Sequence, residues 1–184
     1  MKKILILLLK LIGALFIVGA IAVFAIIIKY RLELPNIQSM VEDYKPQMAT
    51  IIYDKNNNVV DTLSVEAREV VKLEDVSPYV KDAFLAIEDK QFYSHHGLNF
   101  KGIARAVITT FLKGRATQGG SSITQQLAKN AFLTPEKTFS RKVKEAILTY
   151  QIERTYTKDE ILERYLNEIY YGSGSYGIKN AAEQ

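Results

Sequence analysis

The chain has 184 residues, of which 48% are hydrophobic, and a formal net charge of +4, so it can form one domain with a core besides an anchor. It contains no cysteine, which excludes a disulfide framework and a thiolate metal site. Lysines and arginines recur between residues 101 and 144 and favour an anionic partner, with nucleic acid, anionic lipid and a phosphate-bearing substrate all open on composition alone.

An uncharged apolar run extends from Leu11 to Ile28 and would span about 27 Å as a helix, which is enough to cross a bilayer core. We interpret it as a single transmembrane helix. A cleaved signal peptide is the alternative, but the apolar run continues past the small residues that would mark a cleavage site. Lysines are more frequent before the run than after it, which predicts a cytoplasmic N-terminus and an extracytoplasmic domain.

We divide the chain into three segments: a tail and membrane helix at 1–30, a linker with a small β element at 31–72, and a domain at 73–184. In the second segment, Ile51–Tyr53 and Val59–Val60 flank a turn-rich stretch and predict a hairpin, with Val70–Val71 as a third strand.

The third segment opens with a helix. Ser77 and Pro78 are typical of an N-cap and a first helical position, and Val80, Phe84 and Ile87 recur at helical spacing as an apolar stripe. This helix is expected to end at Glu88.

Glu88 is therefore predicted at the negative end of a helix dipole and beside Asp89, an environment typical of a general acid or base. The alternative is a solvated helix end in which His95 caps a turn at Gly97.

A second helical pattern, with Ile103, Val107 and Ile108, ends near Gly114. The polar, glycine-rich stretch Gly114–Gly120 predicts a poorly ordered loop that could gate a substrate. The next residues, Ser121 and Ser122, are typical of a helix start whose hydroxyl and backbone N–H groups favour an anion. An ordinary capped helix with its polar face in water is the alternative.

Another helix is expected from near Ser140 to Arg154, with Val143, Ile147 and Tyr150 on its apolar face. Arg141, Lys142 and Lys144 lie in its first turns, where the dipole disfavours cations, and this favours a nearby anion. The pair Arg141 and Glu145 can also be a plain surface i,i+4 pair.

Thr157 and Glu160 predict a capping box for the next helix, whose core side would contain Ile161, Leu162, Tyr165, Leu166 and Ile169. The chain closes with a glycine-rich turn at 171–177 and the start of a helix. We expect it to end within a domain, as a fragment.

Together, these segments resemble the ordered motifs of the peptidoglycan glycosyltransferases, glycosyltransferase family 51. The motifs are Glu88-Asp89-x-x-Phe92-x-x-His95-x-Gly97, Gly120-Ser121-Ser122-Ile123-Thr124-Gln125-Gln126, Arg141-Lys142-x-x-Glu145 and Lys158-x-Glu160-Ile161-x-Glu163-x-Tyr165-Leu166-Asn167. The resemblance covers about residues 73–184, and the preceding part is similar to the N-terminus of a class A penicillin-binding protein. The second motif commonly has threonine where Ser122 stands, and the family's fifth motif is cut short at Gln184. No segment within residues 1–184 resembles a transpeptidase domain.

The resemblance implies a mainly α, lysozyme-like fold with two lobes around a cleft. It implies that Glu88 is the catalytic base, which takes the proton from the acceptor sugar's 4-hydroxyl in lipid II. Glu145 would be the second essential carboxylate, assisting the donor pyrophosphate with or without a Mg²⁺ or Mn²⁺ ion. The residues implied to hold the donor are Ser121, Gln126, Lys129, Arg141 and Lys142, and the supporting motif residues are Asp89, Phe92, His95, Gly97, Thr124, Gln125 and Asn130.

The implied partners are lipid II, the growing glycan chain and the membrane, with envelope, divisome or elongation proteins as further candidates and no nucleic acid. The implied location is the bacterial inner membrane, and the process is cell wall biogenesis. Two other functions are open. A lysozyme-like lytic glycosidase also uses two carboxylates but has little use for the cations, and a non-enzymatic membrane-anchored envelope scaffold would leave the polar motifs on the surface.

Overall fold

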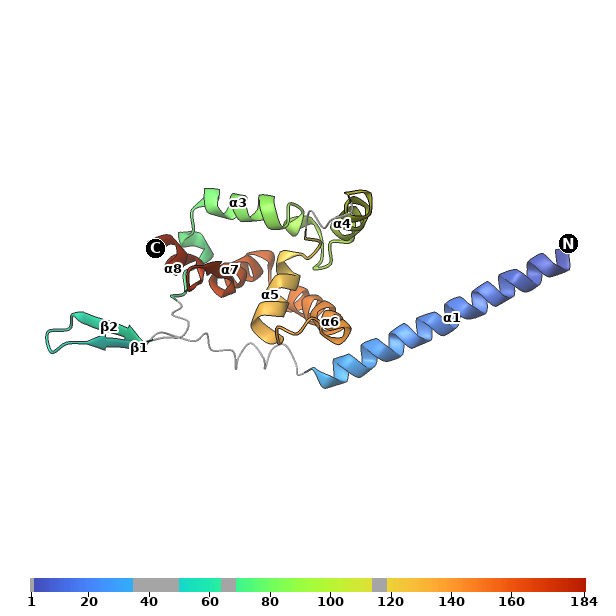
Figure 1. Cartoon of the computed structure of the whole chain (residues 1–184), viewed down its shortest axis with the longest axis horizontal. Helices are drawn as coiled ribbons and strands as arrows, with labels where there is room; N and C mark the ends of the chain where they lie inside the picture. Colours follow the sequence, from blue (N-terminus) through green and yellow to red (C-terminus); the bar gives the residue numbers. More distant parts are fainter. Residues whose placement is uncertain (1, 35–49, 64–68, 114–118) are drawn as a thin grey trace. The chain divides into compact units, whose positions relative to one another are not determined.

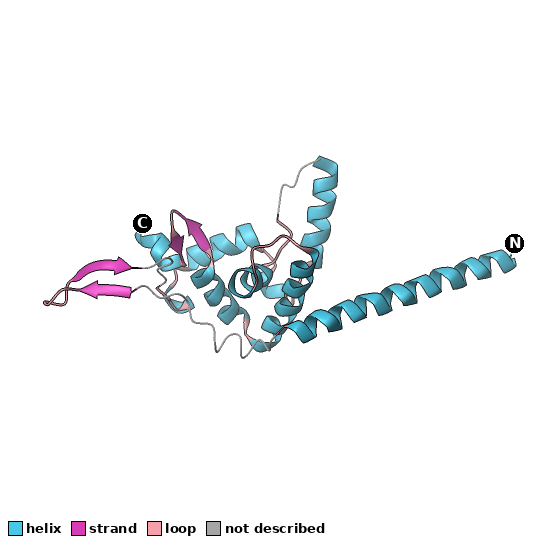
Figure 2. Ribbon diagram, turned by 60° about the horizontal axis from the view of Figure 1, so that its bottom comes forward, coloured by secondary structure: helices cyan, strands magenta, loops and turns pink. Residues whose placement is uncertain are grey.

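The structure is a computed structural model, and it describes residues 2–34, 50–63, 69–113 and 119–184. The chain divides into two compact units, Met1–Pro35 and Asn36–Gln184. The second unit is mainly helical, with two small hairpins (Figure 2). The predicted mainly α fold with a small β element is therefore confirmed.

The first unit contains one helix, α1 (Lys2–Glu33), which includes the predicted span. Its stretch Leu9–Glu33 is long and apolar enough to cross a membrane. Large apolar side chains are exposed along it, among them Leu15 and Phe16 at 74% and 78%. A helix that is apolar all round and exposed fits a lipid environment, because lipid can cover what protein does not.

The predicted first hairpin is confirmed: β1 (Thr50–Tyr53) pairs antiparallel with β2 (Val59–Leu63). Asp54 closes the turn, where its Oδ1 accepts the backbone N–H groups of Asn56 at 2.7 Å and Asn58 at 2.9 Å. Asparagine and aspartate are favoured in such turns because their short side chains bond the local backbone. These bonds lower the pKa of Asp54.

The predicted third strand at Val70–Val71 is wrong. This segment is held by side chains of helix α7 (Lys158–Glu168) instead of a strand partner. Asn167 accepts the Val71 N–H through Oδ1 at 3.0 Å and donates Nδ2 to the Val71 carbonyl at 2.8 Å. Glu163 accepts the Leu73 N–H at 2.7 Å. The amide of Asn167 thus supplies the donor and acceptor that a neighbouring strand would supply.

We expect Asn167→Ala to lower the free energy of unfolding by about 1–3 kcal/mol, because it leaves part-buried backbone groups of Val71 without partners. Urea unfolding of the detergent-solubilised protein measures the change. Asn130→Ala is the matched control, since Asn130 is exposed. Equal stability of the two variants would contradict a structural role for Asn167.

The core of the second unit is formed by α5 (Ile123–Phe132), α6 (Phe139–Thr155) and α7, which contact one another (Figure 1). The capping box that begins α7 is confirmed, and the bonds from Thr157 lower the pKa of Glu160. Four of the predicted core residues of α7 are buried, namely Ile161, Leu162, Tyr165 and Leu166, while Ile169 is its half-buried C-cap.

Helix α6 turns a different face inward from the predicted one. Its buried apolar residues are Leu148 and Ile152, whereas Tyr150 is 58% exposed. The cause is Glu145, which is only 2% exposed and contacts Gln125 of α5. The inward face of α6 therefore contains a charged residue, which a search for apolar periodicity cannot detect. The helix begins after the N-cap Thr138, whose side chain accepts the Arg141 N–H at 3.1 Å.

Two helices precede this core. Helix α3 (Pro78–Glu88) follows a 3-10 turn, η1 (Leu73–Asp75), and ends at Glu88 as predicted. Phe84 packs edge-to-face on Tyr171, with ring centroids 5.6 Å apart. The prediction that Ile87 belongs to the apolar stripe is wrong, because this residue is 75% exposed. The half-buried face of α3 consists of Val80, Lys81, Phe84 and Leu85.

Helix α4 (Phe100–Lys113) follows the 3-10 turn η2 (Phe92–Ser94) and confirms the second helical pattern. Phe100, Ile108 and Phe111 are exposed at 72%, 59% and 88%, so these three residues do not belong to the core. The loop predicted at Gly114–Gly120 lies mostly outside the described residues; Gly119 and Gly120 have no regular structure.

The glycine-rich turn forms a second hairpin of β3 (Tyr170–Gly172) and β4 (Ser175–Tyr176), followed by α8 (Ile178–Glu183). Gly177 precedes α8 with φ +80°, a conformation that favours glycine, and it lies against the Asn167 carbonyl. The hairpin thus joins the last described helix to the end of α7.

Candidate active site

Glu88 is an exposed carboxylate at the last position of α3. Its Oε2 accepts a hydrogen bond from Gln126 Nε2 of α5 at 2.7 Å. The buried phenol of Tyr165 lies nearby: burial raises its pKa, and the negative charge of Glu88 raises it further. Glu88 is therefore held at one oxygen and open to solvent, which suits a group that must accept a proton from a ligand.

Asp89 has a different role from its neighbour. It is only 5% exposed. Its carboxylate accepts hydrogen bonds from His95 Nε2 at 2.8 Å, Asn99 Nδ2 at 3.2 Å and the Ile123 N–H at 3.3 Å. The sequence places Asp89 beside Glu88 as a like charge, but these three donors compensate the charge of the Asp89 carboxylate. His95 is the C-cap residue of η2, and its side chain pairs with Asp89.

Backbone N–H groups at the start of α5 are hydrogen-bonded by side chains of the protein itself. Ser122 forms a capping box with Gln125, and the Ile123 N–H is bound by Asp89. The Ser122 hydroxyl also donates to the Gly97 carbonyl. The ordinary capped helix is thus the correct interpretation for Ser122, because the groups predicted to bind an external anion already bind the protein.

Gly97 is required at the turn that meets Ser122. Its φ is +87°, and a Cβ there would lie 2.7 Å from Thr149 Cγ2 and 2.9 Å from Glu153 Cγ. Both the backbone conformation and the space exclude a side chain.

A second group of motif residues is internal. Phe92 is 1% exposed, and the Lys158 ammonium lies 4.4 Å from its ring centroid. Lys158 also donates to Glu153 at 2.8 Å, and Glu153 accepts from the hydroxyl of the buried Thr124. Thr124 therefore links α5 to Glu153 of α6, and Phe92 packs against Lys158 at the start of α7.

Glu145 forms the charged centre of the site. It is 2% exposed; Arg141 Nη1 donates to its Oε2 at 3.1 Å, and Gln125 Nε2 donates to its Oε1 at 3.2 Å. Lys142 also donates to Oε1 and, at 3.2 Å, to the Ser121 hydroxyl. We name Arg141, Lys142, Glu145 and Ser121 the cation cluster. With two cations and one carboxylate it carries one net positive charge, and the surface-pair alternative for Arg141 and Glu145 is wrong.

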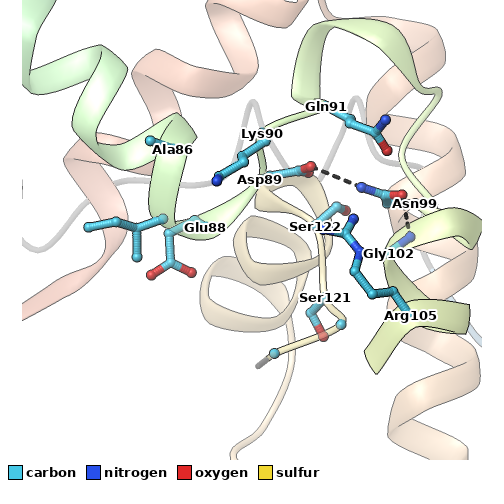
Figure 3. Close-up of a pocket in the computed structure, with 13 residues that line it drawn as sticks. Ala86, Glu88, Asp89, Lys90, Gln91, Asn99, Gly102, Arg105, Ser121 and Ser122 are labelled. Carbon is cyan, nitrogen blue, oxygen red and sulfur yellow. Dashed lines mark hydrogen bonds between the residues drawn. The ribbon is translucent and has the colours of Figure 1, made fainter. Parts of the chain in front are cut away.

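Glu88 lines an open pocket between the end of α3, α4 and the start of α5 (Figure 3). Ser121 lines it too, so the pocket borders the cation cluster through the residue that Lys142 contacts. Glu145 does not line this pocket. The structure thus has an exposed Glu88 at the pocket and a buried Glu145 outside the pocket lining, connected through the adjacent residues Gln126 and Gln125 of α5.

The structure does not join every predicted residue to this site. Lys129 and Asn130 are exposed at the end of α5, and no ion pair with another described residue connects Lys129 to the cation cluster. Sequence reasoning missed Glu153, Lys90 and Arg105. Lys90 and Arg105 line the pocket. The only signal for Arg105 was the recurrence of cations between residues 101 and 144, and Lys90 had none.

The described residues do not favour a divalent cation at Glu145. Both oxygens of this carboxylate accept hydrogen bonds, two of them from cationic groups. Mg²⁺ and Mn²⁺ prefer free oxygen ligands with negative charge, and no group of three or more His, Asp or Glu side chains suited to a metal occurs in the described part of the chain.

Comparison with known proteins gives a family match and several relatives. Residues 56–184 match the profile of a family described as Transglycosylase, whose domain is lysozyme-like. The match begins before the 73–184 segment expected from the motifs.

Several curated relatives are similar over most of the chain. Penicillin-binding protein 1A of Aquifex aeolicus is 43% identical over 183 residues, which cover 100% of this chain and 24% of that protein. Penicillin-binding protein 1A of Neisseria flavescens is 44% identical over 92% of this chain and 21% of that protein. Penicillin-binding protein 1F of Bacillus subtilis is 50% identical over 71% of this chain and 18% of that protein.

The chain thus spans about a fifth to a quarter of the length of these relatives. The profile covers more than half of the chain, and the pocket and the cation cluster are built from residues within the matched range. The chain therefore belongs to the transglycosylase family.

Proposed function

We propose that this protein is a peptidoglycan glycosyltransferase that polymerises lipid II into glycan strands. The observation that carries the proposal is the pocket in which an exposed carboxylate, Glu88, lies near the cation cluster, which borders the pocket through Ser121. A proton acceptor and a stabiliser of negative charge are the two components that sugar transfer from a pyrophosphate needs.

In the proposed reaction, Glu88 takes the proton from the 4-hydroxyl of the acceptor sugar. The hydroxyl oxygen then forms a bond to the anomeric carbon of the growing chain, and the bond from that carbon to the lipid pyrophosphate breaks. Gln126 occupies one oxygen of Glu88, which leaves the other oxygen to accept the proton.

The cation cluster would stabilise the departing pyrophosphate. Lys142 is 48% exposed, whereas Glu145 is 2% exposed, so the cluster presents positive charge outward over its buried carboxylate. Arg141 Nε is buried and has no described partner. In this mechanism Glu145 positions the two cations, which supply positive charge facing the pyrophosphate.

The same geometry argues against a lytic glycosidase. Hydrolysis of a sugar bond uses two carboxylates on either side of that bond. Glu145 cannot act in this way while its oxygens are bound by Arg141, Lys142 and Gln125. A purely structural scaffold would not need an exposed Glu88 beside buried charges.

We place the protein in the bacterial cytoplasmic membrane with its domain outside the cytoplasm, and we propose lipid II and the growing glycan chain as its substrates. The support for the orientation is the lysine bias around α1. Envelope, divisome or elongation proteins as partners are part of the proposal, and nucleic acid is not.

The orientation has a direct test. Protease added to intact spheroplasts should remove the domain after residue 30, because that part of the chain would be outside. A cytoplasmic marker protein that survives the same treatment is the control. Protection of the domain in cells that remain intact would reverse the proposed orientation.

We expect Lys142→Ala to raise the apparent Michaelis constant for the glycan donor about tenfold and to weaken its dependence on salt, because one charge facing the pyrophosphate is lost. Arg154→Ala is the matched control, since Arg154 lies at the other end of α6 and is exposed. An unchanged Michaelis constant and salt slope in Lys142→Ala would contradict the phosphate role.

The activity itself is tested by incubating the protein in phospholipid vesicles with labelled lipid II. Labelled polymer that a muramidase degrades is the expected product. Absence of polymer from folded protein, as judged by circular dichroism, would contradict the proposed function.

A further inference from the structure

Two cations line the Glu88 pocket that the quoted family motifs do not specify: Lys90 stands at an open position of the first motif, and Arg105 lies outside all four. Lys90 follows the end of α3, and Arg105 extends from α4 into the pocket (Figure 3). Both side chains are exposed, and neither forms an ion pair within the described part of the chain. Their charges are thus available to a ligand in this pocket.

The pocket is on the acceptor side of the site. A general base must reach the proton that it removes, so the acceptor hydroxyl has to enter the pocket that Glu88 lines. The cation cluster borders the same pocket only through Ser121. Lys90 and Arg105 are therefore separate from the cations assigned to the departing pyrophosphate.

A bonded network fixes these elements relative to Glu88. Asn99 donates to Asp89 at 3.2 Å and accepts the Gly102 N–H at 2.7 Å, which ties the first turn of α4 to the residue between Glu88 and Lys90. Arg105 lies one turn after Gly102. The protein thus sets the backbone position of Arg105 relative to Glu88 before any ligand binds.

We propose that Lys90 and Arg105 form an anion-binding subsite for the acceptor substrate. This inference rests on the proposed function. The group bound is an anionic oxygen group of the acceptor, either its pyrophosphate or a carboxylate of its stem peptide. The planar guanidinium of Arg105 can bind either group with two parallel hydrogen bonds, and Lys90 adds a second charge.

The test measures initial rates against lipid II concentration at a saturating level of a preformed glycan oligomer that acts as donor. Arg105→Gln should raise the Michaelis constant for lipid II about tenfold while kcat stays within about twofold, because a charge-assisted contact to the acceptor is lost. Lys90→Gln should change it in the same direction. Arg105→Lys should recover part of the loss.

Lys101→Gln is the matched control, because it removes the same charge from an exposed position one turn earlier on α4, outside the pocket lining. A Michaelis constant for lipid II in Arg105→Gln and Lys90→Gln equal to that of Lys101→Gln would overturn the subsite. If the wild-type protein forms no polymer, the proposed function fails instead, so the two failures are distinct.

A second acceptor identifies the bound group. With a lipid II that lacks the stem peptide, a persistent effect of Arg105→Gln assigns the pyrophosphate, and loss of the effect assigns a peptide carboxylate. An effect of Arg105→Gln on the oligomeric donor alone would place this residue on the donor side and overturn the acceptor subsite.

Discussion

Glu88→Gln should lower the rate of lipid II polymerisation by about 10²–10⁴-fold, because the variant keeps the shape of the side chain but cannot accept the proton. The amide oxygen of the new residue can still accept the hydrogen bond from Gln126, so the pocket should keep its geometry. Binding of lipid II should therefore remain close to that of the wild type. Single-turnover polymerisation and direct binding of labelled lipid II measure the two quantities separately.

Asp82→Asn is the matched control, since Asp82 is an exposed carboxylate on the same helix that does not line the pocket. Polymerisation by folded Glu88→Gln at the wild-type rate would place the base elsewhere. Asp89 could not replace Glu88 without rearrangement, because His95, Asn99 and the Ile123 N–H already bind its carboxylate.

Glu145→Ala should lower the free energy of unfolding by about 3 kcal/mol, equivalent to roughly 6–12 °C in Tm, because it leaves Arg141 and Lys142 together without their common counter-ion. It also leaves Gln125 with an unpaired buried amide. Glu145→Gln should cost less, since it keeps the volume and one acceptor oxygen. Thermal unfolding followed by circular dichroism measures both.

Glu136→Ala is the control for the loss of a glutamate, because Glu136 is exposed. If Glu145→Ala unfolds at the same temperature as Glu136→Ala, Glu145 does not anchor the cations. If Glu145→Gln instead polymerises lipid II with an unchanged Michaelis constant for the donor, the positive charge facing the pyrophosphate does not depend on this carboxylate.

Local signals were sufficient for most elements of the fold. The apolar run predicted α1, and the box formed by Thr157 and Glu160 predicted the start of α7. These signals work because capping bonds, turn bonds and helical periodicity join residues a few positions apart. The ordered motifs also indicated the family that the profile match then showed.

The same reasoning failed where a side chain is bound from a distant part of the chain. Val70–Val71 has the composition of a strand, but its partner is the side chain of Asn167, 96 positions further along. Ile87 fits a helical stripe, but the direction in which α3 faces its neighbours leaves it exposed. Residue spacing cannot predict the partner of Val71 or the exposure of Ile87, because each depends on which distant part of the chain packs against that segment.

For the site, the sequence by itself determined which chemical groups are available: a carboxylate at the end of α3, polar residues at the start of α5, and cations in the first turn of α6. Only the tertiary structure decided their roles. Glu88 and Asp89 are neighbours in the chain, yet one is exposed and the other is buried among three donors. The physical reason is that burial and charge pairing are set by contacts between α3, α5 and α6, which bring together residues far apart in the sequence.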